Sequence, residues 1–151
     1  MLSSNKLCRR PRRGQSTVEL ALAAPVLILL LVVGGDFSRL FFTNIDLNQA
    51  ARAGAQYGSQ TVITAADSTG IKNAVTTAGS SISGLAVTTS QCTCAASSTV
   101  AACGSGYNCA NDTSATYVTV KASATYTTIT QYPGMPASVP LSATAIMAVQ
   151  Q

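Results

Sequence analysis

The chain has 151 residues, which suffices for one modest domain and not for two ordinary ones. Only 9% of the residues are charged, 47% are hydrophobic, and the sequence contains no histidine and no tryptophan. Five of the nine cations precede residue 14, so the rest of the chain has four cations against five acids, a net side-chain charge of −1. This balance argues against nucleic acid as a partner and leaves a short basic arm, which typically orients a chain in a membrane.

An uncharged run of sixteen residues, Leu20–Gly35, follows Glu19. As a helix it would measure roughly 24 Å, short of the ~30 Å hydrocarbon core of a bilayer. Residues 15–18 make up the deficit, but they draw Glu19 into the membrane edge. A carboxylate there is costly unless it meets a cation or is protonated, so we interpret Glu19 as a functional residue.

Three interpretations of this N-terminal region compete. A cleaved secretory signal should end in a small-residue cleavage site, but the sequence continues as GGDFSRLFF. A plain signal anchor explains the charge and the hydrophobicity but gives no role to Gly14 or Glu19. The third interpretation uses the basic leader, Gly14, the four intervening residues, Glu19 and the apolar run together, because this order resembles the type III signal of type IV pilin-like proteins.

That resemblance implies cleavage after Gly14 by a prepilin peptidase on the cytoplasmic side. Gln15 would become the first residue, where many pilins have phenylalanine, and Glu19 would become the fifth. The new N-terminal amine would be a cation for the Glu19 carboxylate of a neighbouring subunit, which offsets the cost of a poorly solvated charge. Gly14 and Gln15 are therefore the expected processing site, and Glu19 the expected assembly contact.

Further motifs extend the pattern to Gly58. They are a Val-Glu-Leu-Ala box, an early proline in the apolar run, an acidic-Phe-x-Arg segment and an Ala-rich ending, at Val18–Ala21, Pro25, Asp36–Arg39 and Ala50–Tyr57. The combination is similar to the TadE-like family of tight-adherence (Flp) pilus assembly proteins. The resemblance implies a minor pilin or pseudopilin of the bacterial inner membrane. Its N-terminus would be cytoplasmic, its C-terminal domain periplasmic or extracellular, and its partners other pilins, the assembly machinery and membrane lipid.

Residues 15–58 are predicted to form one helix of 44 residues, roughly 65 Å long. Its second half carries an apolar stripe at helical intervals, expected to pack mostly on its own domain: Phe37, Leu40, Phe41, Leu47, Ala51, Gly54 and Ala55. We therefore divide the chain into a leader (1–14), this helix, and an exported domain (59–151).

The exported domain is predicted to be α+β, with a short helix and an antiparallel sheet of about three strands. Asp67 starts the helix pattern within residues 66–79, and β-branched segments indicate strands at 85–90, 115–129 and 141–149. The middle strand alternates, and the face expected to form the core carries Val118, Val120, Ala122, Ala124 and Tyr126.

Cys8 lies in the leader, so four cysteines remain, within the loop 92–109: Cys92, Cys94, Cys103 and Cys109. Two disulfides are the favoured interpretation, with Cys92 and Cys94 each paired to Cys103 or Cys109. A site holding a metal by all four thiolates is the alternative, but the spacing is unusual for zinc and no histidine assists, so we expect no metal. A glycosylation sequon at Asn111–Thr113 is discounted because the resemblance implies a bacterium.

No nucleophile–base arrangement, phosphate-binding loop or cofactor motif is present in the sequence, so we expect a protein that is not an enzyme and needs no cofactor. The preferred function is assembly of a tight-adherence pilus through helix–helix contacts. The alternative is an unprocessed single-span anchor that presents an adhesive or binding domain. A soluble secreted protein, recovered without residues 20–35, is a third class.

Overall fold

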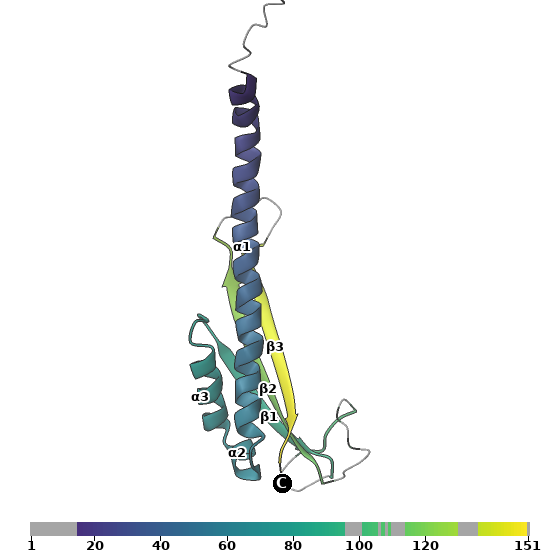
Figure 1. Cartoon of the computed structure of the whole chain (residues 1–151). Helices are drawn as coiled ribbons and strands as arrows, with labels where there is room; N and C mark the ends of the chain where they lie inside the picture. The colour runs from purple at the N-terminus through teal and green to yellow at the C-terminus, as the bar shows by residue number, and fades with distance from the viewer. Residues whose placement is uncertain are drawn as a thin grey trace, which may run out of the picture. The chain divides into compact units, whose positions relative to one another are not determined.

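The computed structural model describes residues 15–95, 101–105, 107, 109, 114–129 and 136–150 (Figure 1). The predicted leader with Gly14 and Cys8, and the sequon Asn111–Thr113, lie outside these residues. The chain divides into two compact units, Met1–Phe37 and Ser38–Gln151. We call residues 15–37 the apolar segment and the described part of the second unit the head.

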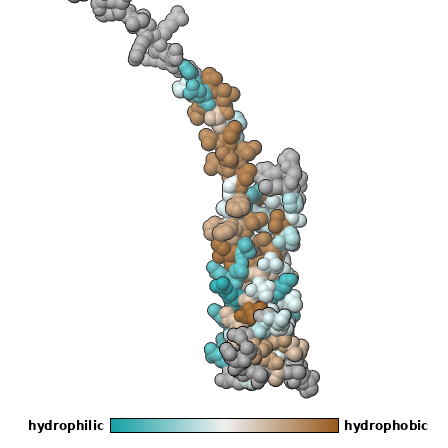
Figure 2. Space-filling model, turned by 90° about the vertical axis from the view of Figure 1, so that its right-hand side faces the viewer, coloured by the Kyte–Doolittle hydropathy of each residue, from teal (hydrophilic) through white to brown (hydrophobic). Residues whose placement is uncertain are grey.

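Helix α1 (Gln15–Gly58) contributes to both units, as the sequence predicts. Leucine and alanine favour the helix, and the helix continues through Pro25. In the apolar segment the large aliphatic side chains are exposed, and they form the continuous hydrophobic surface that Figure 2 shows along this part of the helix. α1 is long and apolar enough to cross a membrane.

Two short helices follow α1 in the head. α2 (Val62–Ala66) begins with a capping box, in which the Thr61 hydroxyl accepts from the Thr64 amide and the Thr64 hydroxyl accepts from the Thr61 amide. α3 (Ser68–Ala78) corresponds to the predicted short helix and is capped by Asp67. α2 was not predicted, because five residues are too few for an apolar period to show.

The sheet has three antiparallel strands in the order β1-β2-β3, namely β1 (Ala86–Thr93), β2 (Thr116–Thr127) and β3 (Ser138–Ala148). Val120 of β2 lies opposite Thr89 of β1 and Ala145 of β3, which fixes the register. The α+β fold, with its long helix and three-stranded antiparallel sheet, is therefore confirmed.

The core of the head lies between the helices and one face of the sheet (Figure 1). On β2 the buried residues are those of the predicted core face, Val118, Val120, Ala122 and Ala124, while Tyr126 is half-buried. α1 contributes mainly small side chains. A Cβ built on Gly54 would collide with Val75 of α3 and lie 3.3 Å from Val120 Cγ1, so α1 approaches both elements closely.

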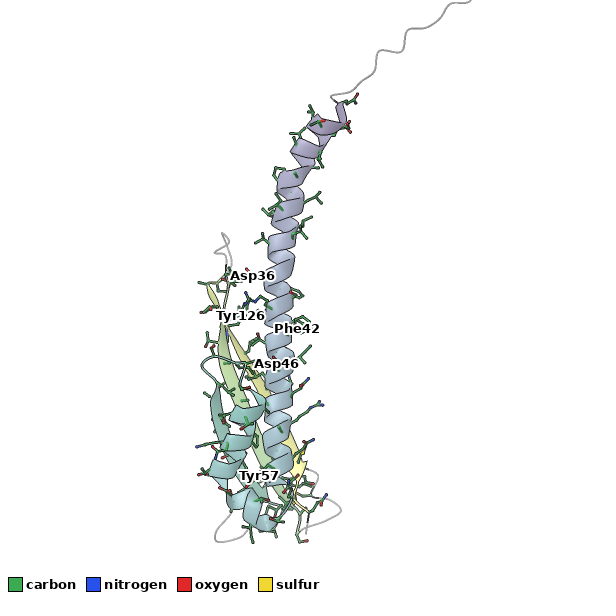
Figure 3. The ribbon with its side chains drawn as sticks, turned by 60° about the vertical axis from the view of Figure 1, so that its left-hand side comes forward. Asp36, Phe42, Asp46, Tyr57 and Tyr126 are labelled. Carbon is green, nitrogen blue, oxygen red and sulfur yellow. A yellow bond between two sulfur atoms is a disulfide. The ribbon has the colours of Figure 1, made fainter. Side chains whose placement is uncertain are left out.

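The apolar stripe predicted on α1 is buried only from Leu47 onward. Leu47, Ala51 and Ala55 are fully or almost fully buried, but Phe41 is largely exposed. Its neighbour Phe42, 64% exposed, is directed away from the sheet in Figure 3. Helical periodicity identifies an apolar face, but it does not show whether the protein itself covers that face.

Candidate functional site

The predicted assembly contact, Glu19, lies in the second turn of α1 with its side chain exposed. Gln15 Nε2 donates a hydrogen bond to Glu19 Oε1 across 3.3 Å. Both residues therefore face the same side of the helix, as an i,i+4 spacing requires. Because its side chain is exposed, the Glu19 carboxylate is accessible, as the predicted pairing with a neighbouring subunit requires.

The apolar segment offers hydrophobic contact in every direction around the helix axis. The seven consecutive residues Val26–Val32 all have exposed side chains, with exposures from 43% to 75%. Seven residues make almost two helical turns, so no side of this stretch is covered. A surface of this kind requires either lipid or other apolar helices around it.

At its other end, α1 is joined to α3 by a polar contact between Tyr57 and Asp67 (Tyr57 is labelled in Figure 3). The Tyr57 hydroxyl donates to Asp67 Oδ2 across 3.1 Å, and the Gly70 amide donates to Asp67 Oδ1 across 2.9 Å. The bond from Gly70, together with that from Tyr57, lowers the pKa of Asp67. The same carboxylate raises the pKa of Tyr57, because it accepts a hydrogen bond from the protonated phenol and would repel a phenolate.

The four cysteines of the loop form two disulfides, Cys92–Cys103 and Cys94–Cys109. Their Cα–Cα distances are 4.9 Å and 5.4 Å, within the usual range for a disulfide. The structure thus supplies the connectivity that the sequence leaves open. Each bond joins one cysteine of the C-x-C pair at the end of β1 to one of the two later cysteines.

The loop is also held to the sheet by other contacts. The Tyr107 hydroxyl lies 2.8 Å from Thr119 Oγ1 on β2, and the rings of Tyr107 and Tyr117 are 5.4 Å apart. Backbone bonds join Thr93 to Ala101 and Cys103. These contacts place Tyr107 against the sheet face opposite the helices. This role of Tyr107 was not predicted, because a lone tyrosine in a polar loop belongs to no periodic pattern or motif.

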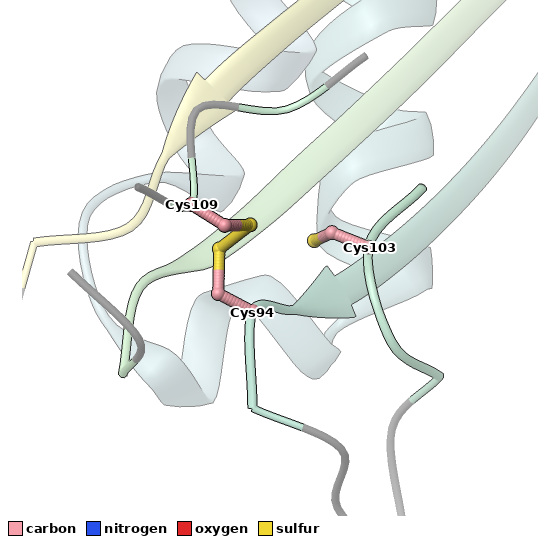
Figure 4. A group of neighbouring side chains, drawn as sticks. All are labelled: Cys94, Cys103 and Cys109. Atoms are coloured by element: carbon pink, nitrogen blue, oxygen red, sulfur yellow. A yellow bond between two sulfur atoms is a disulfide. The ribbon is translucent and has the colours of Figure 1, made fainter. Parts of the chain in front are cut away.

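Three of the loop's sulfur atoms, those of Cys94, Cys103 and Cys109, lie within 4.8 Å of one another (Figure 4). The grouping has the compactness that a metal site needs. A metal requires thiolates, however, and each of these sulfurs is engaged in a disulfide. In the oxidised form, the four cysteines therefore hold the loop by two covalent cross-links.

Comparison with known proteins concerns the N-terminal part of the chain. Residues 14–56 match the family described as TadE-like protein. The resemblance inferred from the motifs is thereby confirmed for this stretch, which we call the TadE-like segment. No curated protein and no solved structure gives a significant match to the chain.

The TadE-like segment contains Gly14, Gln15 and Glu19, and it ends one residue before Tyr57. It therefore includes all of the predicted processing and assembly residues and none of the cysteines of the loop. The structure brings Gln15 and Glu19 together, whereas Gly14 lies outside the described residues. The sheet and the disulfide loop lie beyond the match and rest on the structure alone.

Proposed function

We propose that the protein is a minor pilin or pseudopilin of the tight-adherence system, inserted in the bacterial inner membrane by its TadE-like segment. Prepilin peptidase cuts after Gly14, and the Glu19 carboxylate then pairs with the N-terminal amine of a neighbouring pilin. The head lies on the periplasmic or extracellular side. The function is assembly by helix–helix contact, without catalysis and without a cofactor.

One observation carries this proposal: an exposed Glu19 stands at the fifth position of a 44-residue helix that begins at Gln15, in a stretch that matches the TadE-like family from residue 14. The uncovered apolar surface of Val26–Val32 supports insertion among lipids and like helices. The two disulfides support an oxidising location for the head, because such bonds persist outside the cytoplasm.

The described carboxylates of the head support a role other than catalysis. Asp67 caps α3 and accepts from Tyr57, and Asp46 accepts a hydrogen bond from Ser81 across 3.3 Å. Both acids therefore have structural partners. Since the sequence lacks histidine, no residue has an unperturbed pKa suited to acid–base work near neutral pH.

Glu19 is tested by substitution in the native host, with Glu19→Gln as the test variant and Asp46→Asn as the matched control. Glu19→Gln removes the charge at constant shape, so we expect normal membrane insertion but a loss of copurification with other pilins of at least about tenfold, as for a buried ion pair left with one partner. Asp46→Asn should assemble normally, because Asp46 bonds to Ser81 within the head. Unchanged copurification of Glu19→Gln would refute the assembly role.

Processing is tested by the N-terminal mass of the chain purified from its native membrane. A start at Gln15 supports cleavage after Gly14. An intact Met1 would favour the alternative, an unprocessed anchor that presents a binding domain. A start beyond Gly35 would refute both and identify an ordinary secreted protein.

A further inference from the structure

A cavity of about 310 Å³ lies in the head at the end where the chain enters from the apolar segment. Three segments surround it: the first turns of the head's part of α1, the turn after α3, and the last residues of β2 with the residues after them. Figure 3 labels Tyr126 at this end of β2. The lining residues are Arg39, Thr43, Ser81, Ile82, Ser83, Ala124, Thr125, Tyr126, Thr127 and Ile129.

The chemistry of this lining favours an anion. Arg39 contributes a guanidinium group, and none of the described lining residues has a carboxylate. Two of the five aliphatic hydroxyls already donate, Thr43 to the Arg39 carbonyl and Ser81 to Asp46. Ser83 supplies a third hydroxyl, whereas Thr125 and Thr127 alternate with the core-facing Ala124 and Tyr126 and have their side chains on the other face of β2. A guanidinium and several hydroxyls suit phosphate, whose oxygens accept two parallel N–H bonds from arginine.

The position of Arg39 along α1 indicates where such a phosphate comes from. Arg39 follows Gly35, the last residue of the uncharged run, by four residues, or roughly 6 Å along the helix axis. The headgroup region extends about 5–8 Å beyond the hydrocarbon on each side of a bilayer. If the apolar run spans the membrane, as the proposed function requires, Arg39 lies at the depth of the lipid phosphates.

The cavity also has an apolar border. Ile129, which is 67% exposed, lies beside the hydroxyls, and Ile82 is half-buried in the same lining. A headgroup carries glycerol and acyl carbons next to its phosphate, so it would contact both kinds of group. Free inorganic phosphate would use only the polar part.

We propose that this cavity binds the headgroup phosphate of an anionic phospholipid in the leaflet next to the head. This inference rests on the proposed membrane insertion. Arg39 is the principal contact, the Ser83 hydroxyl donates to a remaining oxygen, and Ile129 contacts the lipid carbons. The bound lipid holds the head at a fixed depth against the membrane surface.

The test compares lipid retention by the full chain. Wild type, Arg39→Gln, Arg39→Lys and Arg52→Gln are reconstituted in bilayers of phosphatidylcholine with a minor share of phosphatidylglycerol, which gives the membrane a negative surface potential. They are then extracted mildly for native mass spectrometry. We expect wild type to retain phosphatidylglycerol and Arg39→Gln to bind it about tenfold more weakly, as for a lost charged hydrogen bond. Arg39→Lys should be intermediate, because lysine keeps the charge and loses the fork geometry.

Arg52→Gln is the matched control, because Arg52 is an exposed arginine of the same helix that does not line the cavity. It should retain lipid as wild type does, and an equal loss in both arginine variants would overturn the site in favour of general charge attraction. Displacement of the lipid by millimolar inorganic phosphate would show a free-anion site and overturn the headgroup assignment. Equal retention by Arg39→Gln, with all variants membrane-inserted, would overturn this inference alone, whereas absence of wild type from the membrane would overturn the proposed function as well.

Discussion

The two parts of α1 are both apolar, yet they are built for different surroundings. In residues 15–37 the surface is made of large aliphatic side chains exposed on all sides, such as Leu31 at 75% exposure. From Leu47 onward the apolar residues are mostly small and are buried against the sheet and α3, as at Ala50 and Ala55. Side-chain size, more than hydrophobicity, therefore distinguishes the part of the helix that the protein covers.

The physical reason is the rigidity of the neighbour. Lipid chains conform to any apolar surface, so a segment facing them needs only bulk and hydrophobicity. A sheet and a second helix are rigid, and a helix lying against both must have small residues at the points of closest approach. Gly54 is such a point, because even a methyl group there would collide with Val75.

The largest effect expected from this comparison is that of shortening a leucine. Leu47 is fully buried, so Leu47→Ala should lower the free energy of unfolding of the head by about 2–5 kcal/mol through lost burial and a cavity. Leu31→Ala should leave the head unchanged and weaken membrane insertion by only about 0.5 kcal/mol. Urea unfolding of the full chain in detergent, followed by circular dichroism, measures both. Equal destabilisation of the head by the two variants would contradict the distinction between the exposed and the buried part of α1.

The features that could be predicted are those with a long period or a specific motif. The 44-residue helix, the three strands and the core face of β2 each repeat their signal over many residues, and the structure contains them. The TadE-like resemblance was predictable because several short motifs occur at consistent spacing, and the family match confirms it.

The features that could not be predicted depend on contacts between distant residues. The bond between Tyr57 and Asp67, the disulfide connectivity, and the tilted ring contact of Tyr107 with Tyr117 all join segments whose juxtaposition only the fold supplies. Tyr57 belonged to a recognised motif, but nothing in the motif names its partner. The exposure of Phe41 was missed for the converse reason, because periodicity cannot show that a covering element is absent.

A second, smaller effect is expected from adding one methyl group at matched glycines. Gly54→Ala should destabilise the head by a net of about 1–2 kcal/mol, because overpacking against the stiff Val75 outweighs the gain in helix propensity. Gly34→Ala should be neutral or slightly stabilising to the helix, since a Cβ at Gly34 has no neighbour within 4 Å. Thermal unfolding of both variants in detergent provides the measurement, and a stable Gly54→Ala would mean that α1 is not close-packed against α3.

The smallest effect concerns acid stability, and it distinguishes the carboxylates at the two ends of α1. The pKa of Asp67 is lowered in the folded head, so the unfolded state binds its proton more readily. The stability that Asp67 contributes is therefore complete above its ordinary pKa of 3.8 and is lost as the pH falls through the lower folded value. Asp67→Ala should remove this contribution at neutral pH, with a smaller loss of stability than in Leu47→Ala.

Asp67→Asn separates the charge from the hydrogen bonds in this test. Asparagine still accepts from the Gly70 amide as a helix cap, so the variant should keep most of the stability at neutral pH while its unfolding temperature varies less below about pH 4. Glu19→Gln should not alter the acid dependence of the head, because Glu19 bonds to Gln15 within its own helix turn. If Glu19→Gln changed that dependence as much as Asp67→Asn, the carboxylate of the apolar segment would be stabilising the head, and the two parts of α1 could not be treated as separate in function.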